Sequence, residues 1–177
     1  MKLKQLIFLT TMVCASSSTL AQTCFTQDFS ITTPTSRFTI TGDVVTDNVT
    51  KLVWKRCAYG QVWNGDSVSC TGTAVRVTWQ EALNLAVSEE SNDLNEWRLP
   101  NIKELSSIVE KSCVDPAVNM TVFPNAIAEE FWSSTTSAIR TPSLQYTNAW
   151  AIAFYNGRNN QQYKDTNNYI RLVKFAE

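Results

Sequence analysis

The chain has 177 residues, of which 44% are hydrophobic and 18% are charged, a composition typical of one globular domain rather than of a disordered or collagen-like chain. Its 15 Lys and Arg residues stand against 16 Asp and Glu residues, a formal net charge of -1, so no global basic field attracts nucleic acid or an anionic membrane. The sequence contains no histidine, which excludes Ser-His-Asp and Cys-His catalytic arrangements and histidine metal ligands.

The chain begins with the features of a secretory signal peptide, Met1 to Ala21. Two lysines form the charged start, Leu6 to Val13 form a short apolar run, and Thr19 to Ala21 provide a small-residue cleavage site. The apolar run is shorter than the roughly 20 residues that span a bilayer. We therefore expect an exported protein without a membrane span, located in the periplasm, at the cell surface or outside the cell. Loss of the two lysines leaves 13 basic and 16 acidic residues, a net charge of -3.

An N-terminal extension, residues 22–42, follows the predicted cleavage site and is expected to be tied down by Cys24. A single domain is then predicted over residues 43–177. Near its start, the stretch from Thr41 to Asn48 carries oxygen-bearing side chains spaced for a turn, without the regular positions and final Glu of a calcium loop. We expect a turn here and no cofactor, with a bound calcium ion as the alternative.

Four cysteines remain after signal cleavage, and an even number in an oxidising compartment predicts two disulfides, with three connectivities available. The spacing favours Cys57–Cys70 together with Cys24–Cys113, because the first pair closes a short loop. The other two connectivities stay open. A zinc site is disfavoured, since the sequence has no C-x-x-C pair and no histidine.

The first strand is predicted over residues 51–55, where side chains alternate with a period of two. The dipeptide Asn64-Gly65 then predicts a hairpin inside the proposed loop between Cys57 and Cys70. A helix is predicted from Thr78, which forms a T-x-x-E capping box with Glu81. A second short helix is predicted after Pro100, where Asn101 can cap and Glu104 stands three residues later.

Three further strands are predicted in the second half of the chain, at residues 131–135, 149–154 and 169–174. In the middle one, Trp150, Ile152 and Phe154 share one face and the opposite face is all alanine, which indicates a central strand covered on both sides. An Asn156-Gly157 turn follows it. Together these elements predict an α+β fold, a single compact domain with antiparallel sheets, two short helices and two disulfides.

Two polar segments are candidate ligand sites because loops on a rigid scaffold commonly carry binding residues. Trp63 stands beside Asp66 at the predicted hairpin tip, where an exposed aromatic ring suits stacking on a sugar or a partner surface. The other segment offers amides, an arginine and tyrosines, which hydrogen-bond polyols or proteins. Its candidate residues are Tyr155, Asn156, Arg158, Asn160 and Tyr163.

Four blocks of sequence in order resemble the Lcl C-terminal domain family, the C-terminal domain of collagen-like bacterial adhesins, formerly a domain of unknown function. The most specific block is the run W-R-L-P-N-x-K-E-L, and the resemblance covers residues 43–174. One departure is Lys51, where the family usually has Gly, so the turn before the next strand is expected to differ. The four blocks are residues 45–57, 97–105, 131–135 and 169–173.

The resemblance implies a fold related to the C-type-lectin-like and formylglycine-generating-enzyme-like folds, in which Arg98 and Glu104 belong to the scaffold. The spacing of Trp97 and Trp132 places these two rings in the core as well. Relatives are exported bacterial surface or extracellular proteins, some of which bind sulfated glycans and promote adhesion. This chain has no collagen-like repeat, and its mature charge lacks the basic surplus that a sulfated polymer would favour.

These features favour an exported, non-catalytic recognition module that binds a glycan or a cell-surface partner, in the manner of an adhesin. The alternative is a structural or accessory subunit of an envelope assembly, such as a pilus or a secretion system. A carboxylate-based glycoside hydrolase is a remote third hypothesis, because Glu81 and Glu104 are already explained as helix-cap partners. We assign no catalytic residue and no metal ligand, and the sequence does not address the oligomeric state.

Overall fold

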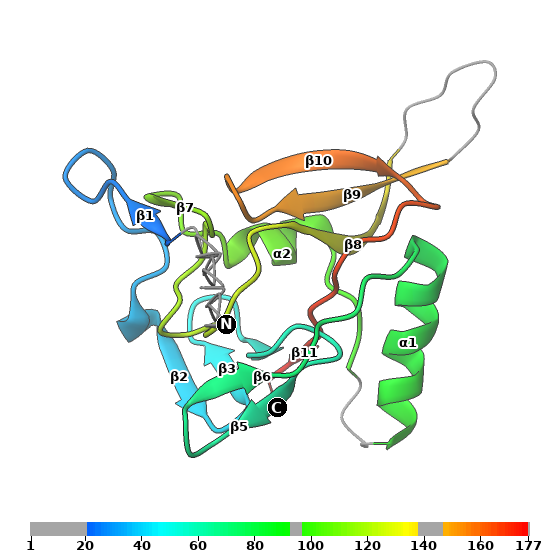
Figure 1. Ribbon diagram of the computed structural model, residues 1–177, viewed down its shortest axis with the longest axis horizontal. Helices are drawn as coiled ribbons and strands as arrows, with labels where there is room; N and C mark the ends of the chain where they lie inside the picture. Colours follow the sequence, from blue (N-terminus) through cyan, green and yellow to red (C-terminus); the bar gives the residue numbers. More distant parts are fainter. Residues whose placement is uncertain (1–20, 93–96, 138–146, 177) are drawn as a thin grey trace, which may run out of the picture.

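Two antiparallel sheets form the framework of the computed structural model, which describes residues 21–92, 97–137 and 147–176. One sheet has the strand order β11-β4-β3-β2 and the other has the order β10-β9-β8. Figure 1 shows the second sheet at the top of the molecule and the first at the bottom. The strands are β2 (Phe38–Thr41), β3 (Val44–Asp47), β4 (Leu52–Lys55), β8 (Glu130–Thr136), β9 (Asn148–Ala153), β10 (Arg158–Tyr163) and β11 (Val173–Phe175).

Two smaller antiparallel pairs extend this framework, and each contains a cysteine of a disulfide. In the first, β1 (Thr23–Cys24) pairs with β7 (Cys113–Val114). In the second, β5 (Val62–Asn64) pairs with β6 (Ser69–Thr71). The bonded pairs are Cys24–Cys113 and Cys57–Cys70, so the connectivity that the spacing favoured is confirmed.

Two α-helices lie in the described chain, and their predicted capping boxes are confirmed. At α1 (Trp79–Asn92), the backbone N and Oγ1 of Thr78 each donate to Glu81 Oε2 at 2.8 Å. At α2 (Ile102–Ser107), Asn101 Oδ1 accepts from the backbone of Lys103 and Glu104, and the Glu104 carboxylate accepts from Asn101 N. No helix of the described residues is long and apolar enough to cross a membrane. The predicted signal peptide lies, except for Ala21, outside the described residues.

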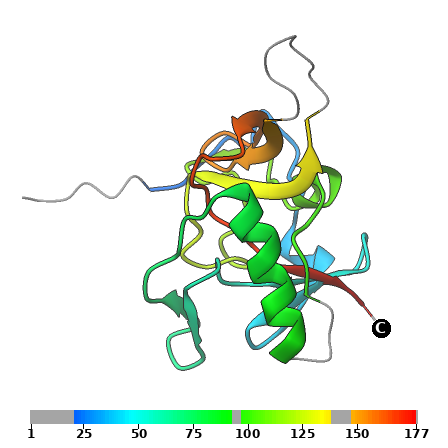
Figure 2. The same cartoon turned by 90° about the vertical axis from the view of Figure 1, so that its right-hand side faces the viewer.

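Helix α2 packs between the two large sheets, whereas α1 stands at one end of the molecule (Figures 1 and 2). Leu105 and Ile108 are fully buried in a cluster that also contains Trp54 of β4 and Ile152 of β9. A second cluster forms beside α1, where Ala82 and Ala86 meet side chains from both sheets. Its large rings and aliphatic chains are Trp97, Leu99, Trp132, Ile170 and Leu172.

Strand β9 is the central strand of its sheet and is covered on both faces, as its alternating pattern predicted. Ala149 and Ala151 are fully buried in the cluster beside α1, while Ile152 belongs to the cluster around α2. The small alanine side chains let helix α1 and the Trp132 ring approach this face closely. Trp150 shares the face of Ile152 but is only half-buried, so its burial is less than the pattern predicted.

The predicted strand at residues 169–174 is only partly right, because regular pairing begins at Val173. The preceding residues run between the two large sheets and hydrogen-bond to each of them in turn. Such a segment keeps the period-two pattern of a strand without belonging to one ladder. Its backbone bonds join Tyr169 to Glu130 and Trp132, Ile170 to Tyr59, and Leu172 to Lys55.

Two turns next to β3 correct the expectation of one turn over residues 41–48. Only Gly42 and Asp43 form the β2–β3 turn, and Val44–Asp47 is strand. The β3–β4 turn contains Lys51 with a φ of 59°, a left-handed conformation that favours glycine. Lys51 therefore adopts a backbone conformation that a glycine would take with less strain.

Candidate functional site

The candidate ligand residues from the sequence lie on two separate surfaces. Trp63 is in β5 and Asp66 is in the exposed β5–β6 turn. The other five belong to the β9–β10 hairpin. Both views show the β9–β10 hairpin at the opposite end of the molecule from the β5–β6 hairpin (Figures 1 and 2). The structure therefore does not bring the seven residues together into one site.

The β9–β10 hairpin uses several of its polar groups internally. Asn160 Nδ2 donates to Glu130 Oε1 at 2.9 Å and to the Tyr155 hydroxyl at 3.3 Å. Asn156 Oδ1 accepts from the backbone N of Arg158, which stabilises the turn. Arg158 and Tyr163 are exposed, and none of these residues borders either of the two cavities described in the structure. This hairpin is thus a polar surface rather than a cleft.

Trp63, by contrast, borders a cleft of about 740 Å³, a volume within the range of about 300–1,000 Å³ that is typical of small-ligand sites. Its walls come from the β2–β3 turn, the end of β4, the segment that leads into β5, and the last part of the chain. Asp66 is not part of the lining. The lining residues are Gly42, Asp43, Lys55, Cys57, Ala58, Tyr59, Gly60, Gln61, Val62, Trp63 and Leu172.

The guanidinium group of Arg56 packs against the Trp63 ring. Its guanidinium carbon lies 4.2 Å from the centre of the ring, a cation–π contact. Arg56 is 2% exposed, and burial lowers its pKa from the usual value. Its guanidinium nitrogens donate to the carbonyl oxygens of Gly42, Thr121 and Val122 at 2.9 to 3.2 Å. Because these bonds fix the cation, the ring that rests on it is fixed too.

The same arginine also positions the opposite wall of the cleft. Besides the bond to Gly42 O, the backbone N of Arg56 donates to Asp43 O at 2.9 Å. The Asp43 carboxylate in turn accepts from Lys55 Nζ at 2.9 Å. Both side chains of this ion pair are partly exposed at the cleft. One buried cation therefore organises the aromatic wall and the charged wall together.

A disulfide provides the covalent restraint of the cleft. Cys57 is one of the lining residues, and its partner Cys70 stands directly opposite Trp63 in the β5–β6 register. The disulfide therefore ties strand β6 of the hairpin to the cleft lining at Cys57. At the other end of the lining segment, Gln61 Oε1 accepts from Ala58 N at 3.1 Å, which holds the Gln61 amide against the wall.

Four polar lining residues were missed by the sequence-based assignment: Asp43, Lys55, Tyr59 and Gln61. The sequence places Asp43 in a predicted turn and Lys55 at the end of a predicted strand. No local pattern marks them, because the cleft forms where the β2–β3 turn meets a segment that follows β4. One signal in the sequence could have extended the site. It is the period-two run before the Asn64-Gly65 turn, which is formed by Tyr59, Gln61 and Trp63.

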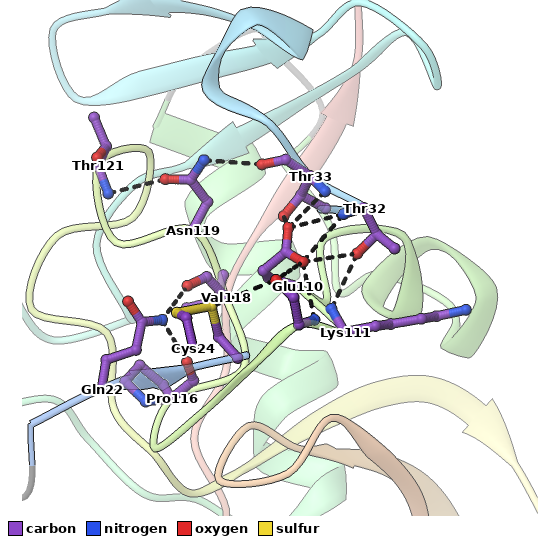
Figure 3. Close-up of a disulfide and its surroundings, with 12 residues drawn as sticks. Gln22, Cys24, Thr32, Thr33, Glu110, Lys111, Pro116, Val118, Asn119 and Thr121 are labelled. Atoms are coloured by element: carbon purple, nitrogen blue, oxygen red, sulfur yellow. Dashed lines mark hydrogen bonds between the residues drawn. A yellow bond between two sulfur atoms is a disulfide. The ribbon is translucent and has the colours of Figure 1, made fainter. Parts of the chain in front are cut away.

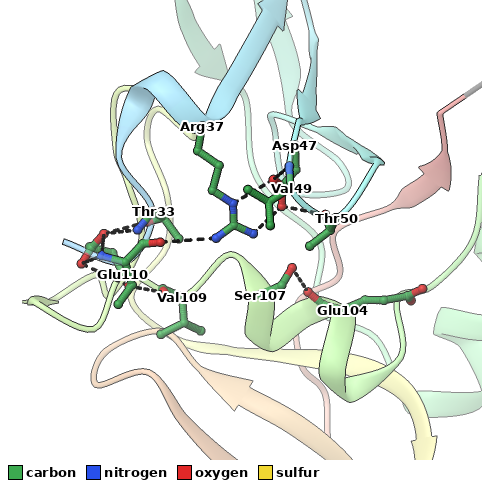
Figure 4. A network of polar contacts seen from close by, with 10 residues as sticks. Thr33, Arg37, Asp47, Val49, Thr50, Glu104, Ser107, Val109 and Glu110 are labelled. Atoms are coloured by element: carbon green, nitrogen blue, oxygen red, sulfur yellow. Dashed lines mark hydrogen bonds and ion pairs between the residues drawn. The ribbon is translucent and has the colours of Figure 1, made fainter. Parts of the chain in front are cut away.

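Two carboxylates outside the cleft, those of Glu104 and Asp47, are held by arginine partners. Arg98 binds Glu104 through two contacts of 2.7 Å, and Arg37 Nε donates to Asp47 at 2.8 Å (Figure 4). Burial would raise the pKa of Glu104 and of Asp47, but the hydrogen bonds of their arginine partners and neighbours lower both below the usual value. Trp97 and Trp132 are 3% and 0% exposed. Both rings therefore lie in the core.

A calcium ion is not supported at the start of the domain. Asp47 is occupied by Arg37, by the Thr50 hydroxyl and by the backbone N of Val49, and Asp43 is paired with Lys55. Within residues 21–92, 97–137 and 147–176, no three His, Cys, Asp or Glu side chains gather in a way that could hold a metal ion.

Glu110 anchors the N-terminal segment to the domain. It is 3% exposed, and its carboxylate accepts from the backbone and hydroxyls of Thr32, Thr33 and Ser112 (Figures 3 and 4). Burial would raise the pKa of Glu110, but these hydrogen bonds lower it to about 2. Gln22 adds bonds to the carbonyl oxygens of Pro116 and Val118 near the Cys24 disulfide (Figure 3).

The comparisons with known proteins place the cleft inside a conserved domain type. A family model described as the Lcl C-terminal domain matches residues 43–174. This match includes every residue that lines the cleft except Gly42, and it leaves out the segment anchored by Cys24 and Glu110. No protein among the curated sequences matches the chain.

Proposed function

Because this chain belongs to the Lcl C-terminal domain family, we propose that it is an exported, adhesin-like recognition domain that binds a glycan or cell-surface partner through the Trp63 cleft. The proposal rests on one observation: the Trp63 ring at the edge of this cleft packs on the guanidinium group of the buried Arg56. An aromatic ring held rigidly beside polar groups binds ligands at a low entropic cost.

Export is supported by the two disulfides, since such bonds persist in oxidising compartments and are rare in the cytosol. The predicted signal peptide agrees with this route.

A non-catalytic role is supported by the state of the buried carboxylates. A general acid at neutral pH needs a raised pKa. The pKa values of Asp47, Glu104 and Glu110 are instead all lowered, because hydrogen bonds outweigh the effect of burial in each case. These groups are built to remain ionised and hydrogen-bonded, which is the behaviour of structural anchors.

The first test is a glycan array probed with the mature protein, residues 22–177, with its disulfides intact. We expect the parent protein to bind at least one glycan on the array. Trp63→Ala should bind that glycan about tenfold more weakly or worse, as for a central aromatic anchor, while the domain stays folded. Circular dichroism and the thermal midpoint check the folding, and Trp63→Phe checks the need for an aromatic ring at this position.

Tyr163→Ala is the matched control, since Tyr163 is an exposed aromatic residue, 54% accessible, on the remote β9–β10 hairpin. Its binding should equal that of the parent protein. Loss of binding in Tyr163→Ala with full binding in Trp63→Ala would show that the binding site lies on the β9–β10 hairpin and not at the Trp63 cleft. A blank array would count against glycan recognition altogether.

A second candidate function, a subunit of an envelope assembly, is favoured by a different surface. Phe25, Phe29 and Ile31 are 46%, 58% and 55% exposed on the loop that follows β1, which projects at one side of the molecule (Figure 1). Three large apolar side chains on one anchored loop are typical of a protein contact. The loop lies outside the residues matched by the family.

This candidate is tested by placing a photo-crosslinking amino acid at Phe29 in cells that make the protein. A defined adduct with an envelope protein is expected if the loop docks into an assembly. The same amino acid at Tyr163, which is exposed on β10 and lies outside the cleft, serves as the control position. Absence of any adduct specific to Phe29 would remove the observation on which this candidate depends.

A further inference from the structure

The two charges that face the cleft cancel each other. Asp43 and Lys55 form an ion pair of 2.9 Å, with side chains that are 50% and 32% exposed. The third charge, on Arg56, is buried under the Trp63 ring and bound by three carbonyl oxygens. At the surface of the cleft, a ligand therefore meets one negative and one positive group side by side, and the charges of these two exposed groups cancel.

We propose that the cleft selects a neutral pyranose sugar with adjacent hydroxyl groups, in preference to sulfated, carboxylated or amino sugars. This inference rests on the proposed function and narrows it to one chemical class of ligand. The sugar spans the Asp43–Lys55 pair with its hydroxyls and lays an apolar ring face on Trp63.

Hydroxyl groups fit the ion pair because each one both donates and accepts. One hydroxyl donates to the Asp43 carboxylate while its neighbour accepts from the Lys55 ammonium group. Hydrogen bonds to charged partners are stronger than those between neutral groups. A neutral diol gains both of them without displacing either charge.

Charged sugars meet a penalty at the same place. A sulfate or carboxylate would be attracted by Lys55 but repelled by Asp43, whose carboxylate lies within 2.9 Å of the ammonium nitrogen. An amino sugar would be attracted by Asp43 but repelled by Lys55. Like charges placed side by side discriminate strongly against the wrong partner.

The apolar part of the lining fits the carbon-bound face of a pyranose. Trp63 offers the ring surface that Arg56 leaves uncovered, and Val62 and Leu172 add aliphatic surface. The Gln61 amide, held by Ala58 N, gives a further neutral hydrogen-bonding group at the wall. Aromatic and aliphatic surface with a few fixed polar groups is the usual make-up of a small-ligand site.

Isothermal titration with matched sugars tests this proposal on the mature protein. The neutral set is lactose, maltose, cellobiose and mannobiose, and each is compared with its sulfated, uronic acid and amino derivatives. We expect at least one neutral sugar to bind about tenfold more tightly than its charged derivatives. Its affinity should hardly change between about 0.05 M and 0.5 M salt, because screening acts on charged ligands.

The variant Asp43→Asn keeps the size of the side chain and removes its charge. It should weaken binding of the neutral sugar about tenfold and bring the sulfated derivative closer to it. The matched control is Asp66→Asn, which removes a carboxylate from the neighbouring turn outside the cleft lining and should change neither affinity.

The outcomes separate the ligand class from the function. Tighter binding of a sulfated, uronic or amino sugar that is lost in Trp63→Ala would overturn the neutral-sugar proposal and leave the recognition function standing. Failure of every sugar to bind the folded protein would overturn the neutral-sugar proposal and would remove glycan binding from the proposed function. Neutral-sugar binding that is unchanged in Asp43→Asn would show that the ion pair does not select the ligand.

Discussion

Replacing Cys24 and Cys113 together with alanine is expected to lower the free energy of unfolding by about 4–5 kcal/mol. The two residues are 89 positions apart, and in the chain-entropy model the stabilisation from a disulfide grows with the loop that it closes, to about 4.7 kcal/mol for 100 residues. Urea unfolding of parent and variant at neutral pH measures the difference. This bond also holds the segment before β2 against the domain, so the variant should be cut earlier by proteases within residues 22–35.

The Cys57→Ala/Cys70→Ala variant is the control for loop length. These cysteines are 13 positions apart, and the same model gives about 3 kcal/mol for such a loop. The protein without the long-range bond should therefore be the less stable of the two. The reverse order would mean that strain or residual structure in the unfolded chain dominates, and would contradict the entropic argument.

Glu110→Gln is expected to lower the free energy of unfolding by about 3 kcal/mol at pH 7. The folded-state pKa of about 2 lies well below the ordinary value of 4.5, and each pKa unit corresponds to about 1.36 kcal/mol. The amide of Gln has one acceptor oxygen in place of two. Its NH₂ group would face the backbone N–H groups of Thr32, Thr33 or Ser112, which are donors themselves.

The direction of the pH dependence follows from the lowered pKa. A carboxyl group whose pKa is lower in the folded protein stabilises it fully above the unfolded value, about 4.5, and loses this effect as the pH falls toward 2. The stability gap between parent and Glu110→Gln should therefore be widest at neutral pH and narrow between about pH 4.5 and 2. Denaturant unfolding at several pH values measures the gap.

Asp66→Asn provides the comparison for charge removal, because Asp66 lies in an exposed turn. Its stability should stay within about 0.5 kcal/mol of the parent, as for most surface substitutions. A Glu110→Gln variant that remains as stable as the parent at pH 7 would show that the hydrogen bonds to this carboxylate contribute little net energy.

The parts of the fold that could be predicted are those coded by residues close in sequence. Capping boxes at Thr78 and Asn101 need residues only three positions apart, and the alternation around Ile152 needs only one strand. The disulfides were accessible because four cysteines allow few pairings. For these features, local physical chemistry and the final structure agree.

The segment at residues 169–172 shows where this reasoning stops. Its alternating side chains are those of a strand, yet its backbone bonds go to two different sheets. Which partner a backbone group finds depends on packing between elements far apart in the chain, and a period of two carries no such information.

The candidate site was predicted in part for the same reason. Trp63 stood out as an aromatic residue beside a turn, and it does border the cleft. The facing residues Asp43 and Lys55 come from the β2–β3 turn and the end of β4, and their approach depends on the buried Arg56. An arginine in that role looks like any other charged residue in the sequence, because its burial is a property of the assembled domain.

The bond between Cys57 and Cys70 has a consequence for the biogenesis of the protein. It joins the floor of the cleft to the strand that faces Trp63, and thiols stay reduced until a chain leaves the cytosol. A newly made chain therefore lacks the covalent tie between the two parts of its recognition surface. Under the proposed function, the cleft of an exported chain would gain this tie only after oxidation, so ligand recognition would mature at the destination of the protein and not where it is synthesised.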